Sequence, residues 1–259
     1  MTSAAAPWLA ALVAMIALAL IAWAIATLKR NTGLVDIFWS LFVLAGAAVH
    51  AAAAPALSSR ATLVLVLATM WSLRLAAYLA ARNWPAEEDR RYRAIRERNS
   101  PGFAGKSLYL VFGLQALLAW VVSAPLAAAI GSSAPLGSLD ALGAALAVFG
   151  IAYETLADGQ LARFKSQPAN VGRVMDRGLW RYSRHPNYFG EFCVWWGLYA
   201  VALGAGAWWT VVSPALMSML LLKVSGVALL EKDIGSRRPM YRHYAARTNA
   251  FFPGPPRQA

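Results

Sequence analysis

Long apolar segments separated by short polar ones dominate the chain. A helix that crosses a bilayer needs roughly 20 apolar residues. Seven segments fit that length: Pro7–Leu28, Leu34–Ala54, Ala61–Ala81, Ser107–Ile130, Leu139–Leu161, Tyr188–Gly206 and Trp208–Leu230. The last two meet at a very short turn and predict a helical hairpin. The pattern therefore predicts an all-α, polytopic integral membrane protein with seven transmembrane helices, folded as a single membrane domain over residues 1–259.

Two polar segments complete the pattern. Pro85–Asn99 predicts a polar cytoplasmic helix, because its acidic residues come first and its basic residues later, as the helix dipole favours. We interpret this helix as a solvated connector. The Pro253–Arg257 segment predicts a loose tail.

Composition agrees with a membrane protein and gives an orientation. Hydrophobic residues make up 59% of the chain, and the mean hydropathy is +0.49. Twenty-one Lys and Arg residues fall in the loops after the first, third and fifth segments and in the tail, whereas only Arg60 falls on the other side. Cytoplasmic loops carry the excess of Lys and Arg, so the N-terminus is expected outside and the C-terminus in the cytoplasm. The net charge of +12 then indicates contact with anionic lipids or ligands rather than nucleic acid.

The polar stretch Asp176–Glu191 (DRGLWRYSRHPNYFGE) separates two apolar segments. Pro186 restricts the residue before it to extended or turn conformations. Asn187 then lies near the N-terminus of the next helix, where free N–H groups favour phosphate. The stretch predicts a site for a polyanionic ligand at the membrane–water boundary; the alternative is a basic loop that only sets topology. Its other candidate ligand-binding residues are Tyr182, Arg184, His185 and Glu191.

Ionisable residues inside apolar segments are costly and mark candidate functional sites. Arg74, Tyr78 and Arg82 recur at i, i+4 and i+8, so they share one helix face that suits a long anionic molecule. Asp36 lies near the start of the second segment. Its alternative to a functional role is helix capping, or pairing with the neighbouring Lys29 or Arg30.

Glu154 and Asp158 form another i, i+4 pair, and Lys165 follows just past the helix. The two carboxylates could accept hydrogen bonds from a ribose or an amide, or they could pair with Arg74 and Arg184. In the C-terminal segment, Tyr241 and Tyr244 lie one helical turn apart among basic residues. This segment and the polar stretch could clamp a nucleotide. With one cysteine and three histidines, the chain predicts no metal site.

These motifs resemble the steroid 5-alpha-reductase family. GLWRYSRHPNYFGE, the apolar hairpin after it and the ending YRHYAARTNAFFP carry the resemblance, which is closest to a bacterial branch of unknown function. LVDIFW and WSLRL resemble the same branch. The similarity covers nearly the whole chain, most specifically Leu156–Pro253. It implies a seven-helix enzyme of the bacterial inner membrane, with its cofactor site facing the cytoplasm.

The implied reaction is NADPH-dependent reduction of a carbon–carbon double bond conjugated to a ketone, in a steroid or similar hydrophobic lipid, as in 3-oxo-Δ4-steroid 5-alpha-reductases. Residues 1–106 would form the substrate side and residues 107–259 the cofactor side. The resemblance implies cofactor binding at Asp158, Lys165, Tyr182, Asn187, Glu191, Tyr244, Arg74 and Tyr78, and its RHP motif covers Arg184 and His185. The residue pattern adds Arg82, Glu154 and Tyr241.

The chain departs from the family on the substrate side. Animal steroid reductases have a Gln-Glu pair where this chain has Val35 and Asp36, and their third-helix tyrosine falls near Trp71. We expect Asp36 to be the catalytic group that hydrogen-bonds or protonates the carbonyl oxygen, if burial raises its pKa. Trp39 and Trp71 are candidates for the substrate wall.

An S-adenosylmethionine-dependent membrane methyltransferase is the alternative, because the isoprenylcysteine and phospholipid methyltransferases share the RHP-x-Y signature. Nine basic residues surround the expected pocket against six acidic ones, including Arg237, Arg238 and Asp233 of the C-terminal segment. This balance favours NADPH, which carries phosphates, over S-adenosylmethionine, which carries none. A non-catalytic lipid-binding or scaffold protein is a further alternative, but it leaves the ionisable residues in the spans without a role.

Overall fold

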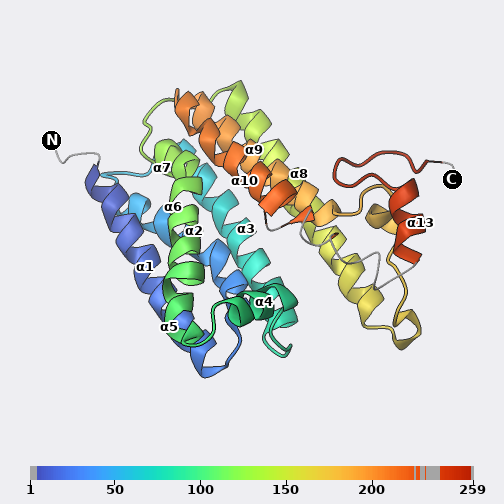
Figure 1. Cartoon of the computed structure of the whole chain (residues 1–259). Helices are drawn as coiled ribbons and strands as arrows, with labels where there is room; N and C mark the ends of the chain where they lie inside the picture. The colour runs from blue at the N-terminus through green and yellow to red at the C-terminus, as the bar shows by residue number, and fades with distance from the viewer. Residues whose placement is uncertain (1–4, 225, 228–230, 232–239, 258–259) are drawn as a thin grey trace. The chain divides into compact units, whose positions relative to one another are not determined.

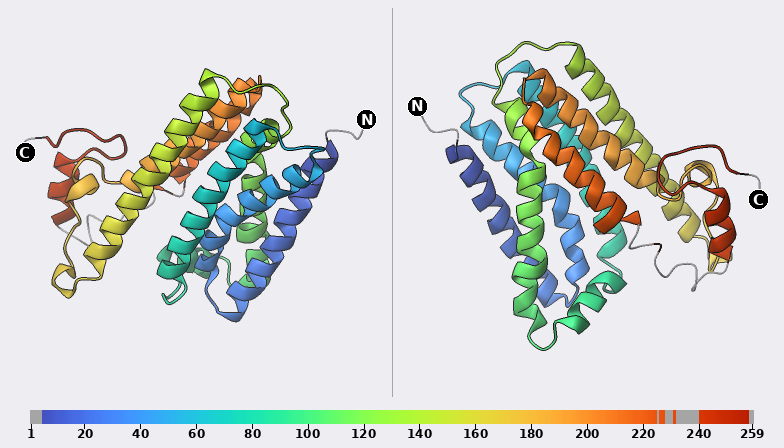
Figure 2. Two further views of the ribbon diagram at one scale, coloured as in Figure 1. Left: turned by 180° about the vertical axis from the view of Figure 1, so that it is seen from behind. Right: turned by 45° about the horizontal axis from the view of Figure 1, so that its top comes forward.

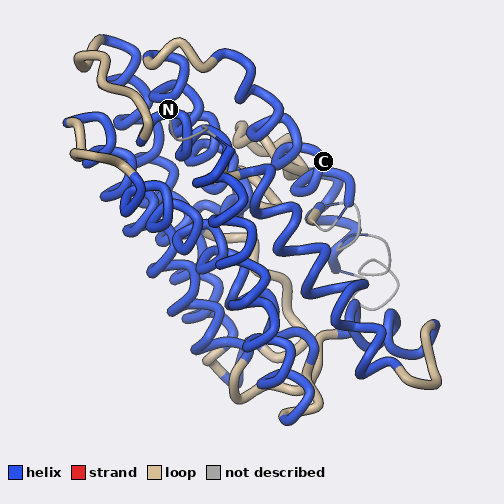
Figure 3. Tube along the Cα trace, turned by 90° about the vertical axis from the view of Figure 1, so that its left-hand side faces the viewer, coloured by secondary structure: helices blue, strands red, loops and turns tan. Residues whose placement is uncertain are grey.

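The structure is a computed structural model, and it describes residues 5–224, 226–227, 231 and 240–257. Regular structure in these residues is entirely helical, as predicted, with no strand among them (Figure 3). The chain forms two compact units: unit 1 comprises Met1–Asp140 and Val201–Thr210, and unit 2 comprises Ala141–Ala200 and Val211–Ala259. The boundary between the two units follows Asp140, whereas the expected boundary between the substrate side and the cofactor side was at residue 106.

Unit 1 is a helical bundle. Its helices are α1 (Ala5–Leu28), α2 (Val35–Ala53), α3 (Ser59–Asn83), α4 (Arg90–Arg98), α5 (Phe103–Ser107), α6 (Leu114–Val122) and α7 (Ala124–Ile130), with a π-helical turn at Leu108–Gly113 between α5 and α6. Helix α2 packs against α1, α3 and α6 (Figure 1). Ser58 caps α3, because its Oγ accepts a hydrogen bond from the backbone N–H of Ala61.

The fourth apolar segment differs from its prediction as one helix over Ser107–Ile130. Helical structure begins earlier, at Phe103, and breaks at Ser123 between α6 and α7. Pro125 explains the break, because it has no N–H to donate to the carbonyl four residues before it. The continuous apolar span is therefore Phe103–Val122.

Helices α8 (Ser138–Lys165), α9 (Pro186–Gly204), α10 (Val212–Met219) and α13 (Met240–Arg247) follow. Short 3-10 turns at Thr32–Leu34, Pro168–Asn170, Gly178–Arg181 and Trp208–Val211 and a π-helical turn at Leu220–Val224 complete the elements. In unit 2, α8 and α9 run side by side (Figure 2). A β-carbon on Gly190 would lie 2.7 Å from the backbone N of Glu154, and one on Gly197 would lie 2.6 Å from that of Ala147. Glycine lets the two backbones touch, as small residues do between membrane helices.

Five described segments are long and apolar enough to cross a membrane: α1, Thr32–Ala53, α3, Phe103–Val122 and α8. The sixth expected span is α9, a helix of 19 residues. The described part of the seventh is the shorter apolar stretch Trp208–Val224, and its expected end at Leu230 lies outside the described residues. The predicted hairpin is confirmed by a turn at Gly206, and Trp196 of α9 donates a hydrogen bond to Ser218 of α10.

The prediction of a solvated connector at Pro85–Asn99 is wrong. The helix, α4, covers only Arg90–Arg98 and starts where Asp89 caps the backbone N–H of Arg91. Tyr92 of α4 is only 7% exposed and lies against Gly33, where an added β-carbon would come 3.3 Å from the tyrosine ring. The segment is therefore docked on unit 1.

The prediction of a loose C-terminal tail is also wrong for its described part. The backbone N–H of Gly254 donates to the carbonyl of Tyr182, and that of Arg257 donates to the carbonyl of Arg247, at 3.0 and 2.9 Å. These bonds tie the tail to the polar stretch before α9 and to the end of α13. Asp233, Arg237 and Arg238, which entered the expected charge balance, lie outside the described residues.

Candidate functional site

Four polar side chains in unit 2 lie on the facing sides of α8 and α9. Glu154 and Asp158 of α8 and Glu191 of α9 are all at least nine-tenths buried. Asn187 of α9 donates a hydrogen bond from Nδ2 to Oδ1 of Asp158 at 3.2 Å. We call these residues the polar quartet. The close approach at Gly190 brings the two helices together beside the contact between Asn187 and Asp158, and each i, i+4 pair lies on one face of its own helix.

The loop before α9 places Asn187 as the sequence predicts. Helix α9 begins at Pro186, so Asn187 lies in its first turn. Proline fits the first helical position because the N–H that it lacks would have no partner there. His185 stacks on Tyr188, with ring centroids 5.6 Å apart.

Arg184 and His185 are engaged by Glu231, one of the six acidic residues expected around the pocket but not expected as their partner. Arg184 binds Glu231 in a bidentate ion pair, and His185 Nε2 lies 2.9 Å from Glu231 Oε1. Tyr241 donates its hydroxyl to the same oxygen at 3.0 Å. Arg184 also donates through Nη1 to the carbonyls of Ala245 and Thr248. Glu231 follows an apolar segment beside other charged residues, so only an expected partner for Arg184 would have singled it out.

Tyr244 and Tyr182 also contact the C-terminal segment or the loop. The Tyr244 hydroxyl donates to the carbonyl of Trp180, and Ser183 O lies 3.2 Å from it. Burial raises the pKa of Tyr244, so its hydroxyl keeps its proton. The Tyr182 side chain is exposed, while its carbonyl accepts from Gly254.

The outer part of unit 2 carries exposed basic side chains. Arg163, Arg177 and Arg181 are exposed, as is Lys165 at the end of α8. The described acidic neighbour is Asp176, which lies 3.7 Å from Arg247. Unit 2 therefore combines buried carboxylates with a basic surface around the loop before α9.

In unit 1, Asp36 belongs to a network that sequence reasoning missed. Arg91 Nη2 donates to Asp36 Oδ2 at 3.0 Å, and the Tyr92 hydroxyl donates to Oδ1. Gln115 Nε2 donates in turn to the Tyr92 oxygen at 3.1 Å. Burial, followed by the charge of Asp36, raises the pKa of Tyr92 well above its ordinary value. The partner of Asp36 is thus Arg91 of α4 rather than Lys29 or Arg30.

The other expected residues of unit 1 lie on α2 and α3. The guanidinium carbons of Arg74 and Arg82 lie 5.7 and 5.6 Å from the centre of the Tyr78 ring, which confirms their shared face. Trp71 is fully buried and Trp39 half-buried. That Arg74, Tyr78 and Arg82 join the residues of unit 2 around one cofactor stays a prediction.

A second missed pair is Arg60 and Asp140, at 1% and 2% exposure. Arg60 binds both oxygens of Asp140, at 2.7 and 2.8 Å, and the carbonyls of Ala134, Pro135 and Gly204. Its position between apolar segments gave no sign of burial, because charged loop residues are usually exposed.

Comparison with known proteins identifies a family without a known activity. The model of a family described as a protein of unknown function (DUF1295) matches residues 22–248. "Uncharacterized protein C594.04c" of Schizosaccharomyces pombe is 25% identical over 284 aligned residues, which cover 95% of this chain and 80% of the yeast protein. No solved structure matches the chain. Because the family model spans nearly the whole sequence, the chain belongs to the DUF1295 family.

Proposed function

We propose that this protein is an NADPH-dependent membrane reductase of a hydrophobic enone lipid, of the steroid 5-alpha-reductase type. The observation that carries the proposal is the polar quartet next to an exposed basic surface within unit 2. Buried carboxylates accept hydrogen bonds from ribose hydroxyls and a carboxamide. Exposed arginines attract phosphates.

The carboxylates and basic side chains of unit 2 suit the chemical groups of NADPH. Asp158 and Glu191 would hold hydroxyl and amide donors, and Asn187 would orient Asp158 as it does here. Arg177, Arg181 and Lys165 would hold phosphates, including the 2′-phosphate that separates NADPH from NADH. When bound, NADPH supplies the hydride, and the protein supplies position and electrostatics.

The Asp36 network is assigned to the carbonyl end of the substrate. Both carboxylate oxygens of Asp36 already accept hydrogen bonds, so we assign Asp36 the role of holding Tyr92. Tyr92 keeps its proton because burial and the Asp36 charge raise its pKa. Tyr92 has one hydroxyl hydrogen, which it donates to Asp36 in this structure. In the reaction this hydrogen would turn from Asp36 to the carbonyl oxygen as negative charge develops there. Trp39 and Trp71 stay candidates for the substrate wall.

Two observations favour the methyltransferase alternative. Glu231 already neutralises Arg184 in this structure, and the interior of unit 2 is acidic. Buried carboxylates suit the ribose hydroxyls and the sulfonium cation of S-adenosylmethionine as well as they suit NADPH. The exposed arginines have no phosphate to bind in that case, which is why we rank this function second.

The proposal includes seven spans in the bacterial inner membrane, with the N-terminus outside and the C-terminus and cofactor side in the cytoplasm. The charge asymmetry supports it, and the one basic residue of the outer side, Arg60, is buried against Asp140. Reporter fusions at Arg98 and Ala259 that read cytoplasmic, and one at Arg60 that reads external, are the expected outcome.

The reaction itself is tested by product analysis. Purified protein is incubated with NADPH deuterated on its transferable hydrogen and with a 3-oxo-Δ4-steroid or a panel of other lipid enones. We expect a saturated ketone that carries one deuterium at the former β-carbon. Transfer of a labelled methyl group from S-adenosylmethionine to a lipid, with no reduced product, would contradict the proposal.

A further inference from the structure

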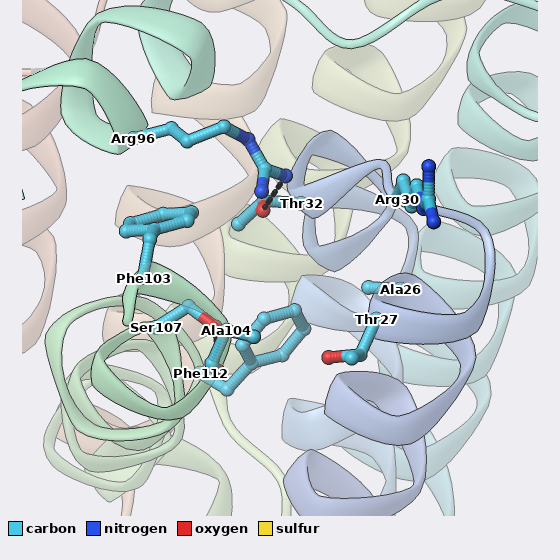
Figure 4. A pocket seen from close by; sticks show the side chains of 9 residues that line it. All are labelled: Ala26, Thr27, Arg30, Thr32, Arg96, Phe103, Ala104, Ser107 and Phe112. Carbon is cyan, nitrogen blue, oxygen red and sulfur yellow. Dashed lines mark hydrogen bonds between the residues drawn. The ribbon is translucent and has the colours of Figure 1, made fainter. Parts of the chain in front are cut away.

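A cavity of about 270 Å³ lies in unit 1, between the end of α1 and the α5 region (Figure 4). Ala26, Phe103 and Phe112 give it apolar walls. Arg30 and Arg96 give it positive charge. The sequence did not predict this cavity, and no residue assigned to the proposed reaction lines it.

The backbone at Arg30 is strained. Helix α1 ends in a Schellman motif, in which Asn31 N–H donates to the carbonyl of Ala26 and Arg30 N–H to that of Thr27. Helix α9 ends in the same pattern with Gly206 at φ 80°, but α1 has Arg30 there at φ 52°. A left-handed conformation costs a side-chain-bearing residue free energy that glycine avoids. Strain of this kind is concentrated at functional sites.

Arg96 is held in place at the opposite wall. Its Nε and Nη2 bind Glu88 at 2.8 and 2.7 Å, and Nη2 also contacts Thr32 Oγ1. Its guanidinium carbon lies 4.8 Å from the centre of the Phe103 ring. In the part of the chain that the structure describes, no hydrogen bond engages Nη1 of Arg96 or the guanidinium of Arg30. Both cationic side chains of the lining therefore keep hydrogen-bond donors for a ligand, and Glu88 is the carboxylate bound to Arg96.

Aromatic and basic residues beside the cavity are of the kinds found at a membrane boundary. Trp23 of α1 donates a hydrogen bond to the carbonyl of Ala104, beside the cavity, at 2.8 Å. Lys29 lies 4.5 Å from the centre of the Trp84 ring. Tryptophan near the end of an apolar helix, with basic residues just beyond, is typical of the interface between lipid and cytoplasm. Anionic phospholipid headgroups lie at this depth.

We propose that this cavity binds the phosphoryl headgroup of an anionic membrane phospholipid. Arg96 binds a phosphoryl oxygen through Nη1, and the exposed Arg30 side chain, which lies apart from Arg96 in Figure 4, turns toward the bound phosphoryl group. The apolar walls contact the adjoining glycerol and the first carbons of the acyl chains. The site is independent of the proposed reductase activity. It ties the end of α1 and the docked α4 segment to the membrane surface.

Native mass spectrometry and thermal unfolding of the full chain test the proposal. The probes are phosphatidylglycerol, the zwitterionic phosphatidylcholine and soluble glycerol phosphate. We expect phosphatidylglycerol to bind and raise the unfolding midpoint, and the other two to do neither. Arg30→Gln should weaken phosphatidylglycerol about tenfold or more, the scale for a lost charged hydrogen bond. Ala104→Phe, which fills the cavity without changing charge, should weaken it similarly.

Two control variants distinguish binding at this cavity from general attraction between the lipid and basic residues, and from unfolding of the protein. Arg98→Gln removes an equal charge from the exposed end of α4 and should leave the affinity within about twofold. Arg30→Gly should bind phosphatidylglycerol weakly while its lipid-free unfolding midpoint stays equal to or above the wild-type value, because glycine relieves the strain. Equal losses in Arg98→Gln and Arg30→Gln would overturn the proposal. So would unchanged binding in Ala104→Phe, or glycerol phosphate binding as tightly as the lipid.

Discussion

Arg184 and Glu231 form a bidentate ion pair although 47 positions of sequence separate them. The Nε–Oε1 and Nη2–Oε2 distances are both 2.7 Å. His185 and Tyr241 contact the same carboxylate. Glu231 therefore holds the loop before α9 and the C-terminal segment together, and unit 2 depends on its charge.

The first prediction concerns pH. Burial raises the pKa of Glu231, but the hydrogen bonds from His185 and Arg184 and their charges lower it more, from an ordinary 4.5 to about 2. A carboxyl whose pKa is lower in the folded state stabilises the fold above its ordinary pKa, and this contribution is lost as pH falls towards the folded value. The unfolding midpoint of the wild type should therefore exceed that of Glu231→Gln at pH 7, and the gap should narrow as pH falls from about 4.5 towards about 2. A gap that stays constant down to about pH 3 would show that charge is not the cause.

The second prediction concerns the buried pair Arg60–Asp140. Removing one member of such a pair leaves the other charge buried and uncompensated, so Arg60→Ala should lower the free energy of unfolding by about 3–5 kcal/mol. Arg98→Ala, at an exposed position, should change it by less than about 0.5 kcal/mol. Reversible denaturant unfolding in mixed micelles measures both. Equal, small effects would mean that Arg60 is solvated in the protein.

The third prediction concerns the contact between α8 and α9. A side chain at Gly190 has no room against the backbone of α8, so Gly190→Val should destabilise the protein by about 1–3 kcal/mol and disturb the polar quartet. The matched control is Gly159→Ala on α8, where an added β-carbon meets nothing within 4 Å. It should be neutral, or stabilising by up to about 1 kcal/mol. Calorimetry of both variants checks the pair; tolerance of Gly190→Val would refute close backbone packing.

The fourth prediction concerns the Asp36 network. Tyr92→Phe keeps the buried ring but removes the hydroxyl, so turnover should fall about 10²–10⁴-fold while NADPH affinity changes only a few-fold. Asp36→Asn should act in the same direction, because Tyr92 loses its charged acceptor. Glu88→Gln weakens the docking of α4 through Arg96 without touching Tyr92, so it should leave turnover nearly unchanged. If Glu88→Gln lowers turnover as much as Tyr92→Phe does, α4 docking rather than the hydroxyl is responsible.

Periodicity made part of the fold and site predictable. Spacing along single helices predicts the apolar segments and the shared face of Arg74, Tyr78 and Arg82. It also predicts that Glu154 and Asp158 share one face of α8. The docking of α4 could not be predicted in this way, because its polar sequence is typical of a solvated helix. Its contacts run from Arg91 and Tyr92 to Asp36, which is 55 or more positions away in the sequence.

The sequence did not predict which charged residues of distant segments form ion pairs. Glu231 and Asp140 each bind an arginine from a distant part of the chain, and no periodic signal says which charge meets which. The left-handed backbone at Arg30 was likewise not predictable. A Schellman motif is recognised in a sequence by its glycine, as at Gly206, and α1 has arginine at that position.

The most direct test of the central claim is an equilibrium titration of the purified full chain with NADPH, NADH and S-adenosylmethionine. We predict that NADPH binds more tightly than NADH, that added salt weakens it, and that S-adenosylmethionine does not bind. Asn187→Ala removes the hydrogen bond that orients the charged Asp158 and should weaken NADPH by about 1.5–3 kcal/mol, the range for a hydrogen bond to a charged group. Tight binding of S-adenosylmethionine with no response to NADPH would contradict the reductase and establish the methyltransferase in its place.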